Sequence, residues 1–334
     1  MPIISERSQV VAVYAEAAQR GWVLPAFNSE NQTTSEAILA AASEYGRQRG
    51  LENLPIIIGI TNNYPDRPQS CYYSQSGRWD IGLRLFLDDL RILASADSPY
   101  ADLRLMIHLD HIQWDKDRQL LGWDLKQFSS IMFDASTLPL DQNIKKTAEF
   151  VKQFGDDLLI EGACDEIGAF PDADNLGLTK PEQAYRYQKE TGVDILVVNL
   201  GTEHRASAAD LHYHADLARE ISALTGARLC LHGTSSLPVG SLSKLFSDGI
   251  RRVNLWTALE RESSVLLFED MITNAAKITG SERTLHYISE GLLGTGVDTE
   301  SRPSIDYFTT TYRQNKIFQY MKINVLDYLK LFYP

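Results

Sequence analysis

The chain has 334 residues, of which 23% are charged, and its formal net charge is −12. This acidic balance argues against a general nucleic-acid surface or an anionic membrane surface as partner. No apolar stretch is long enough to span a bilayer, and no signal-peptide pattern is present. The three cysteines lie far apart without paired spacing, which favours reduced thiols in the cytoplasm over a disulfide framework.

Residues 5–21 have the spacing of a helix that Ser5 opens and Gly21 closes. Eight short apolar runs follow, each ending at a polar residue. The runs cover 23–27, 55–60, 103–109, 130–133, 157–160, 194–200, 227–231 and 251–253. Between them, helical spacing extends over 33–50 (starting at Thr33 or Thr34), 141–155, 180–192 and 211–226. This alternation predicts an α/β fold, a (β/α)8 TIM barrel, with the first helix plugging its amino-terminal end.

Two loops and the last part of the chain depart from this alternation. Residues 61–80 are turn-rich, aromatic and longer than an ordinary βα loop, so they form either a wall of the site or an oligomer contact. Residues 168–178 are typical of a loop that closes over substrate. We expect the barrel to occupy residues 1–282. Residues 283–334 would form a linker and a helical extension, packed on the barrel or on a partner subunit of a homodimer or homotetramer.

Three of the runs end close to a histidine: His111, His204 and His232. Because the carboxyl ends of barrel strands meet at one mouth, these three imidazoles would converge there. Three imidazoles around one point form a catalytic zinc shell with its fourth position open. His108 and Asp110 share one strand face by alternation. His111 would face away from them unless the strand ends there, which the following IQWDKD indicates.

Several motifs, in order, resemble those of the class II, zinc-dependent fructose/tagatose-bisphosphate aldolases. They are VLPAFNSEN, IHLDH, FSSIMFDASTLPLDQNI, TGVDILVVNLGTEH, RLCLHGTSS and RRVNLWTAL. The resemblance implies that His111, His204 and His232 hold Zn²⁺ and that Asp110 handles the hydroxyl proton during C–C cleavage. The resemblance is also compatible with a monovalent cation as a second cofactor. The residues that it places around the substrate are Asn28, Thr61, Gly233, Ser235, Asn254 and Thr257, and those that it places behind the ligands are His108, Asp134 and Glu161.

The chemistry points the same way without the family. Cleavage of a β-hydroxy ketone leaves an enediolate, whose negative charge a Lewis-acidic Zn²⁺ stabilises. A carboxylate next to a metal ligand can move the hydroxyl proton. The alternative of a Schiff base needs a desolvated lysine inside the barrel, and no lysine lies within the eight runs.

The sequence departs from the family in the pocket rather than at the metal. Ala163 replaces the second of two acidic residues that the family carries at the fifth strand. Phe170 and Pro171 stand at the places of the lid glutamates, which leaves Asp172 and Asp174 as substitutes. Arg205 follows the sixth-strand histidine in place of glycine, either as a new anion-binding fork or in an ion pair with Glu203 or Asp210. Trp256 replaces the aspartate of the strand-eight motif, and Gly233-Thr234-Ser235-Ser236 replaces Gly-Gly-Ser-Gly.

These departures favour an aldolase, a carbon–carbon lyase, acting on a ketose or ketose phosphate other than the usual bisphosphate. The alternatives are a conventional fructose- or tagatose-bisphosphate aldolase, a non-catalytic barrel subunit that supports a partner aldolase, and a zinc hydrolase. Cys164 is a poor candidate for a nucleophile because neighbouring carboxylates raise a thiol pKa.

Overall fold

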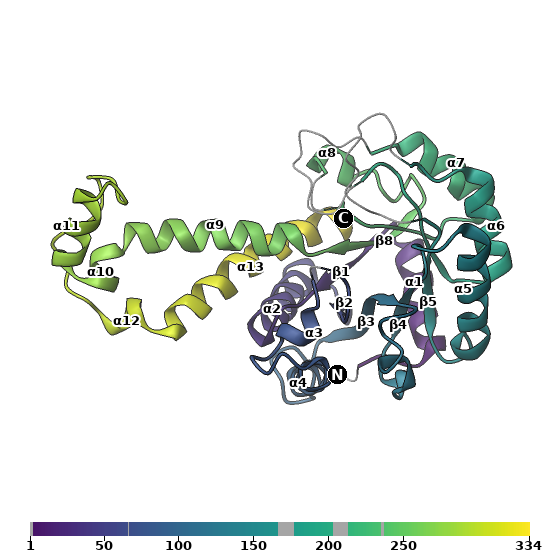
Figure 1. Ribbon diagram of the computed structural model, residues 1–334, viewed down its shortest axis with the longest axis horizontal. Helices are drawn as coiled ribbons and strands as arrows, with labels where there is room; N and C mark the ends of the chain where they lie inside the picture. The colour runs from purple at the N-terminus through teal and green to yellow at the C-terminus, as the bar shows by residue number, and fades with distance from the viewer. Residues whose placement is uncertain (1–2, 66, 166–176, 203–212, 235–236) are drawn as a thin grey trace.

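The computed structural model describes residues 3–65, 67–165, 177–202, 213–234 and 237–334. Its centre is a closed barrel of eight parallel strands in sequential order, with β8 paired to β1 (Figure 1). The strands are β1 (Leu24–Asn28), β2 (Leu54–Thr61), β3 (Leu103–Gln113), β4 (Ser130–Asp134), β5 (Leu159–Ala163), β6 (Ile195–Val197), β7 (Leu229–Leu231) and β8 (Ile250–Leu255). The predicted TIM barrel is therefore confirmed.

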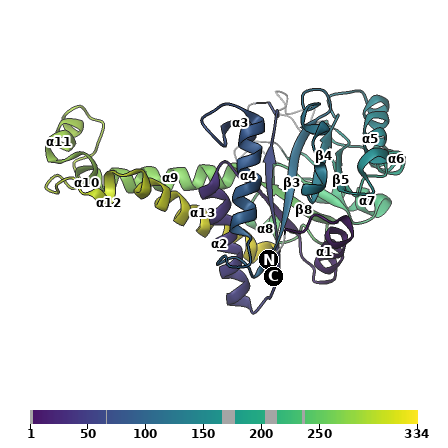
Figure 2. The same cartoon turned by 90° about the horizontal axis from the view of Figure 1, so that it is seen from below.

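Helices on the outside of the barrel connect the strands (Figure 2). They are α2 (Gln32–Arg49), α3 (Gln69–Tyr72), α4 (Trp79–Leu93), α5 (Leu140–Phe154), α6 (Pro181–Thr191), α7 (Ala215–Thr225) and α8 (Val239–Leu242), with short 3-10 turns at Leu120–Gly122 and Leu125–Gln127. The expected start of α2 at Thr33 or Thr34 is wrong by a residue or two. Asn31 caps this helix by accepting a hydrogen bond from the backbone N–H of Thr34 at 3.2 Å.

The first helix, α1 (Arg7–Gln19), buries Val10, Val13 and Ala17. Ser5 does not cap it, because the N-cap is Glu6, which makes no side-chain cap. The Tyr14 phenol is buried near Arg252 of β8, and this burial raises the pKa of Tyr14 to about 12. A side chain of α1 thus reaches residues inside the barrel, as a plug would.

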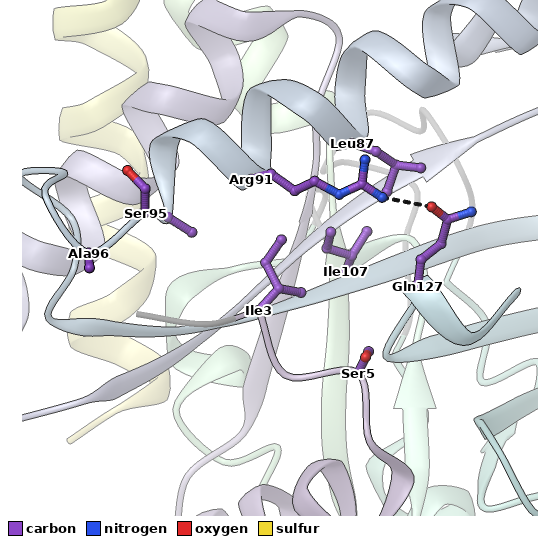
Figure 3. A pocket seen from close by; sticks show the side chains of 9 residues that line it. Ile3, Ser5, Leu87, Arg91, Ser95, Ala96, Ile107 and Gln127 are labelled. Atoms are coloured by element: carbon purple, nitrogen blue, oxygen red, sulfur yellow. Dashed lines mark hydrogen bonds between the residues drawn. The ribbon is translucent and has the colours of Figure 1, made fainter. Parts of the chain in front are cut away.

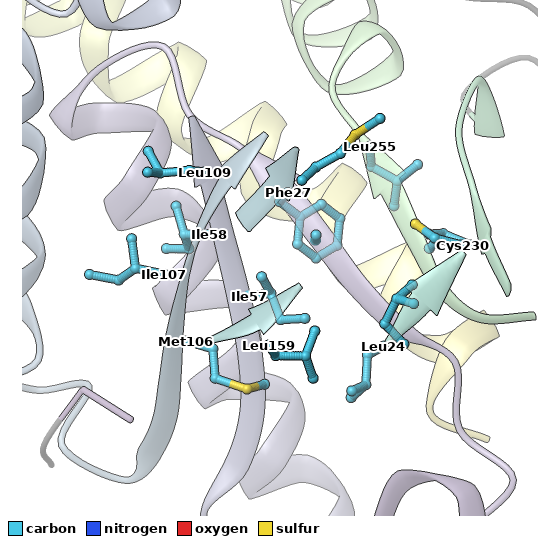
Figure 4. Close-up of a cluster of buried hydrophobic side chains, with 14 of the residues drawn as sticks. Leu24, Phe27, Ile57, Ile58, Met106, Ile107, Leu109, Leu159, Cys230 and Leu255 are labelled. Atoms are coloured by element: carbon cyan, nitrogen blue, oxygen red, sulfur yellow. The ribbon is translucent and has the colours of Figure 1, made fainter. Parts of the chain in front are cut away.

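The barrel core consists of aliphatic and aromatic side chains from successive strands (Figure 4). Ile57, Met106, Leu109 and Phe27 are at most 1% exposed. Continuous apolar runs of this kind are expected where both faces of a parallel strand are covered, inside by the core and outside by helices. The core gives the carboxyl ends of the strands a rigid base.

After β8 the chain leaves the barrel as a long helical arm (Figure 1). Helix α9 (Thr257–Thr273) runs outward, and α13 (Thr310–Phe332) returns beside it and packs along α2. The far end holds α10 (Ala275–Thr279), α11 (Ser281–Ser289) and α12 (Ile305–Phe308). The predicted boundary between residues 282 and 283 falls inside α11 and stays a prediction. Among the described residues, no helix has the length and apolar character that crossing a membrane requires.

Candidate active site

Polar side chains gather where the barrel strands end. Asn28, Thr61 and Asp134 are the last residues of β1, β2 and β4, and His232 directly follows β7. The parallel register pairs Thr61 of β2 with Asp110 of β3. All five of these residues are at most 5% exposed. These strand ends therefore lie together at one end of the barrel.

The strand β3 does not end at His111, contrary to our expectation. It continues to Gln113, but its pairing with β4 is irregular between Leu109 and Ile112. His111 has a φ of 50°, a left-handed conformation that non-glycine residues rarely adopt. A bulge of this kind re-aims a side chain next to a site. It lets the consecutive residues Asp110 and His111 both face the mouth of the barrel.

The predicted end of the fifth strand is also wrong. The apolar run stops at residue 160, so we expected Glu161 to follow the strand. Glu161 lies within β5 instead, and its partners in the register are Met132 of β4 and Ile195 of β6. Its carboxylate is fully buried. It therefore acts from inside the barrel rather than from the rim.

Two of the predicted zinc ligands face each other. His111 Nε2 lies 3.1 Å from His232 Nδ1. The remaining ring nitrogens face carboxylates, with His111 Nδ1 at 3.1 Å from Asp134 Oδ2 and His232 Nε2 at 2.9 Å from Glu161 Oε1. A carboxylate behind a histidine fixes its tautomer and orients its other nitrogen toward a metal.

These residues fit a zinc ion. Each ring can donate one N–H to the carboxylate behind it, which turns its other nitrogen toward a shared metal position. Tetrahedral zinc with Zn–N bonds of about 2.0–2.1 Å holds its nitrogen ligands about 3.3 Å apart, close to the 3.1 Å found here. Asp110 completes a buried group of donor atoms with His111 and His232, all within 4.8 Å of one another. His204, the third predicted ligand, lies outside the described residues.

Asp110 is held by several donors at once. Its Oδ2 accepts hydrogen bonds from Asn28 Nδ2 at 2.6 Å and from Arg67 Nη2 at 3.1 Å, and its Oδ1 accepts one from Asn254 Nδ2 at 2.9 Å. Burial alone would raise the pKa of Asp110, but the charge of His111, a hydrogen bond from His108 and the charges of His232 and Arg67 outweigh it and hold the pKa well below its usual value. Asp110 is thus an ionised carboxylate that its neighbours hold in one place.

A second buried group supports this carboxylate from within the barrel. Glu161 Oε2 forms an ion pair with Arg252 Nη1 at 2.9 Å, and both side chains are 0% exposed. His108 lies between them and the site, with its Nε2 at 3.7 Å from Asp110 Oδ1 and 3.9 Å from Glu161 Oε2. Burial opposes ionisation of Glu161, but Arg252 and His232 lower its pKa to about 2. The predicted role of His108 and Glu161 behind the ligands stays a prediction.

Sequence reasoning missed the contribution of Tyr64, Arg67 and Arg252. Tyr64 stacks on His111, with ring centroids 4.1 Å apart. Together with Arg67, it puts the loop after β2 at the site, so this loop forms a wall there. No local pattern marks these loop residues. Arg252, by contrast, had a signal, because it is a charge inside an apolar run, two residues before Asn254 and so on the same strand face.

Other predicted site residues lie nearby with different surroundings. Thr61 is buried, and its hydroxyl donates to the Arg67 carbonyl, so it supports the loop. Trp256 and Thr257 stand at the start of α9, and Gly233 has a positive φ of 69° just after His232. Four further predicted residues lie outside the described part of the chain: Asp172, Asp174, Arg205 and Ser235.

The Cys164 thiol and a cavity outside the barrel are weaker candidates for a functional site. Burial, and then Asp165, raise the pKa of the Cys164 thiol, which disfavours a nucleophile. A cavity of about 600 Å³ lies on the outside of the barrel, beside α4 and the N-terminal segment (Figure 3). Its polar lining includes Arg91, which donates to Gln127 at 2.9 Å, and none of the described residues that line it carries a carboxylate or an imidazole.

Comparison with known proteins agrees with this geometry. The family described as "Fructose-bisphosphate aldolase class-II" matches residues 8–291. The chain belongs to this family. Class II aldolases are zinc-dependent aldehyde-lyases, so the predicted enzyme class is confirmed and the buried histidine and carboxylate group is its candidate metal site.

The relatives of this class II aldolase are distant. A fructose-bisphosphate aldolase of Staphylococcus epidermidis is 26% identical over 262 residues, covering 77% of this chain and 82% of the relative. Another, of Staphylococcus aureus, is 25% identical over 285 residues, covering 83% and 89%.

Two solved structures share the fold. The crystal structure of fructose-bisphosphate aldolase from Campylobacter jejuni has a TM-score of 0.74 at 17% identity, covering 99% of this chain and 95% of that one. The YdjI aldolase from Escherichia coli has a TM-score of 0.65 at 18% identity, covering 96% and 94%. At this identity, the likeness concerns the fold alone.

Proposed function

We propose that this class II aldolase cleaves and forms a C–C bond in a ketose or ketose phosphate other than the usual bisphosphate. The observation that carries the proposal is the facing pair of imidazole nitrogens on His111 and His232, 3.1 Å apart, beside the ionised Asp110. A bound Zn²⁺ would supply the Lewis acidity that stabilises negative charge on the ketone half. His111 and His232, together with His204, would hold it.

The protein side of the reaction follows from Asp110. In the cleavage direction its carboxylate accepts the proton of the β-hydroxyl group, the C–C bond breaks, and the hydroxyl carbon leaves as an aldehyde. The electron pair stays on the ketone half. Asn28 and Asn254 fix the carboxylate for this transfer through their hydrogen bonds of 2.6 and 2.9 Å.

The unusual substrate is inferred from the pocket. Trp256 adds a bulky ring where the family has an aspartate, and this ring lies against the guanidinium of Arg67, 4.8 Å from its centroid. Such bulk reduces the room for a sugar bisphosphate. We expect kcat/KM below about 10⁴ M⁻¹s⁻¹, the lower end of the ordinary enzyme range, on fructose and tagatose 1,6-bisphosphate. A larger value on either one would restore the conventional aldolase.

The metal is tested separately from the substrate. Protein purified without chelator should contain about one zinc per chain, and His232→Ala should lose it. His286→Ala is the matched control, because His286 is an exposed histidine on α11. Chelation should abolish turnover, whereas borohydride with substrate should leave no adduct on a lysine. Full zinc retention in His232→Ala would refute the site.

The proposal also covers the oligomeric state, the class of substrate, a second cation and the location in the cell. We propose a homodimer or homotetramer, supported by the projecting arm, and a small carbonyl or sugar substrate. A monovalent cation beside the zinc and a cytoplasmic location also stay proposals.

A further inference from the structure

One arginine inside the barrel is in contact with two separate parts of the candidate site. Arg252 lies on β8, and its side chain is 0% exposed. Its Nη1 lies 2.9 Å from Glu161 Oε2. Its Nε donates to Asn254 Oδ1 at 3.2 Å. The planar guanidinium has donors on several sides and can hold two partners in fixed directions at once.

The contact with Glu161 leads to the metal site. The other oxygen of this carboxylate, Oε1, lies 2.9 Å from His232 Nε2. His232 Nδ1 is the nitrogen that faces His111 at the candidate zinc position. A carboxylate that holds one nitrogen of a histidine ring fixes the direction of the other. Because an unpaired charge at this depth is costly, the cation of Arg252 keeps this carboxylate ionised and in place.

The contact with Asn254 leads to Asp110. The amide oxygen of Asn254 accepts from Arg252 and, at 3.6 Å, from the Cys230 thiol, and its amide nitrogen donates to Asp110 Oδ1 at 2.9 Å. Turning the amide over would place its oxygen against the carboxylate of Asp110, and two acceptors repel each other. It would also place the amide N–H₂ against a guanidinium, which only donates. Arg252 therefore selects the orientation of the amide that holds Asp110.

Arg252 itself is remote from any substrate. It has no exposed surface, and the Tyr14 phenol of the first helix lies near its guanidinium. A group buried in this way affects a substrate only through the side chains that it contacts.

We propose that Arg252 is a positioning residue for both parts of the candidate site. It holds His232 through Glu161. It also holds Asp110 through Asn254. The inference rests on the proposed aldolase function for the roles of His232 and Asp110. Metal binding and proton transfer would then depend on the same buried cation.

Zinc affinity tests the contact with Glu161 and needs no turnover. Competition with a chelating indicator should show zinc binding weakened about 10- to 100-fold in Arg252→Met, the usual cost of losing a group behind a metal ligand. In a Glu161→Gln background the same change should weaken zinc binding no further, because the effect passes through this carboxylate. Unchanged affinity in Arg252→Met, or equal weakening in both backgrounds, would overturn the proposal.

Turnover at saturating zinc tests the contact with Asn254. The substrates are fructose 1-phosphate and fructose 1,6-bisphosphate. In Arg252→Met kcat should fall about 10- to 100-fold while KM stays unchanged, because Arg252 does not touch the substrate. The fall in kcat should persist in the Glu161→Gln background, since the contact with Asn254 is independent of that carboxylate. A loss confined to KM, or no loss, would overturn the proposal.

Arg251→Met is the matched control. Arg251 precedes Arg252 on the same strand, points to the other face of β8 by alternation, and lies over the Phe246 ring at 3.9 Å. Neither zinc affinity nor kcat should change in this variant. Arg252→Lys keeps the positive charge beside Glu161 and should recover most of the zinc affinity that Arg252→Met loses.

Urea unfolding shows which variants fold. If Arg252→Met does not fold, the double variant with Glu161→Gln replaces it, because it leaves no buried charge unpaired. Compared with Glu161→Gln alone, the double variant should bind zinc equally well and have a lower kcat, and the reverse result would overturn the proposal. A wild type that binds zinc but cleaves neither compound would contradict the proposed function, whereas the zinc affinities would still decide whether Arg252 positions His232.

Discussion

Asp110 combines deep burial with a negative charge, which is costly unless donors surround it. Asn28, Asn254 and Arg67 supply those donors within 3.1 Å. Because the metal candidates are neighbouring imidazoles, the charge of Asp110 and the binding of zinc can be separated by mutation. Replacing the carboxylate by an amide keeps the shape and removes the base.

We expect Asp110→Asn to retain zinc and to lose cleavage by about 10²–10⁴-fold, the usual contribution of a general base. Zinc content and the turnover number of the same preparation measure both. Asp115→Asn, a change at an exposed aspartate in the turn after β3, should alter neither. A near-normal turnover number in Asp110→Asn would reassign Asp110 to a structural role.

At the scale of the strands, the fit of β1 against β2 sets the position of Asn28. The register places Asn28 beside Gly59, and a Cβ at Gly59 would come within 2.4 Å of Asn28 Oδ1. Only a glycine leaves the amide room to reach Asp110. The glycine is thus required by a side chain on the neighbouring strand.

Gly59→Ala should therefore push Asn28 away from Asp110. We expect kcat/KM to fall about 10- to 100-fold and the free energy of unfolding to fall by about 1–3 kcal/mol from overpacking. Urea unfolding and steady-state kinetics measure the two. Gly122→Ala, where an added Cβ meets nothing within 4 Å, is the control. Unchanged kinetics in Gly59→Ala would show that Asn28 does not position the carboxylate.

The elements also show how far the sequence predicts this site. The strand ends were predictable because apolar runs stop where polar residues begin, and this placed Asn28, Asp134 and His232 correctly. The bulge at His111 could not be predicted. Its φ of 50° results from the pairing of β3 with β4, and no pattern in the neighbouring sequence indicates it. The buried position of Arg67 could not be predicted either, since a single arginine in a turn-rich loop is usually exposed to solvent.

The whole molecule is a barrel with an arm that leaves large apolar side chains in solvent. Phe268 is 67% exposed and Leu292 is 72% exposed. Other exposed apolar residues of the arm are Val265, Leu285, Ile305 and Phe308. Exposed apolar side chains gathered on a projecting element are typical of an interface between subunits.

We expect light scattering to give two or four chains per particle. Phe268→Glu combined with Leu292→Glu should shift the particle toward a single chain, because burying charge at an interface is costly. Ile92→Glu is the control, since Ile92 is 68% exposed but lies on α4 of the barrel. An unchanged mass in the double variant would place the subunit contact elsewhere.

The return of α13 to the barrel also sets an order of events during synthesis. Tyr333 donates to the carbonyl of Pro55, 278 positions earlier, and its own carbonyl accepts from Tyr45. Phe332 likewise accepts a bond from the Val23 N–H. The apolar side of α2 and the first strands therefore stays uncovered during synthesis until α13 has been made. Contacts of such long range form slowly and leave nascent chains open to aggregation, so this chain should depend on chaperones that shield its first βα unit until α13 arrives.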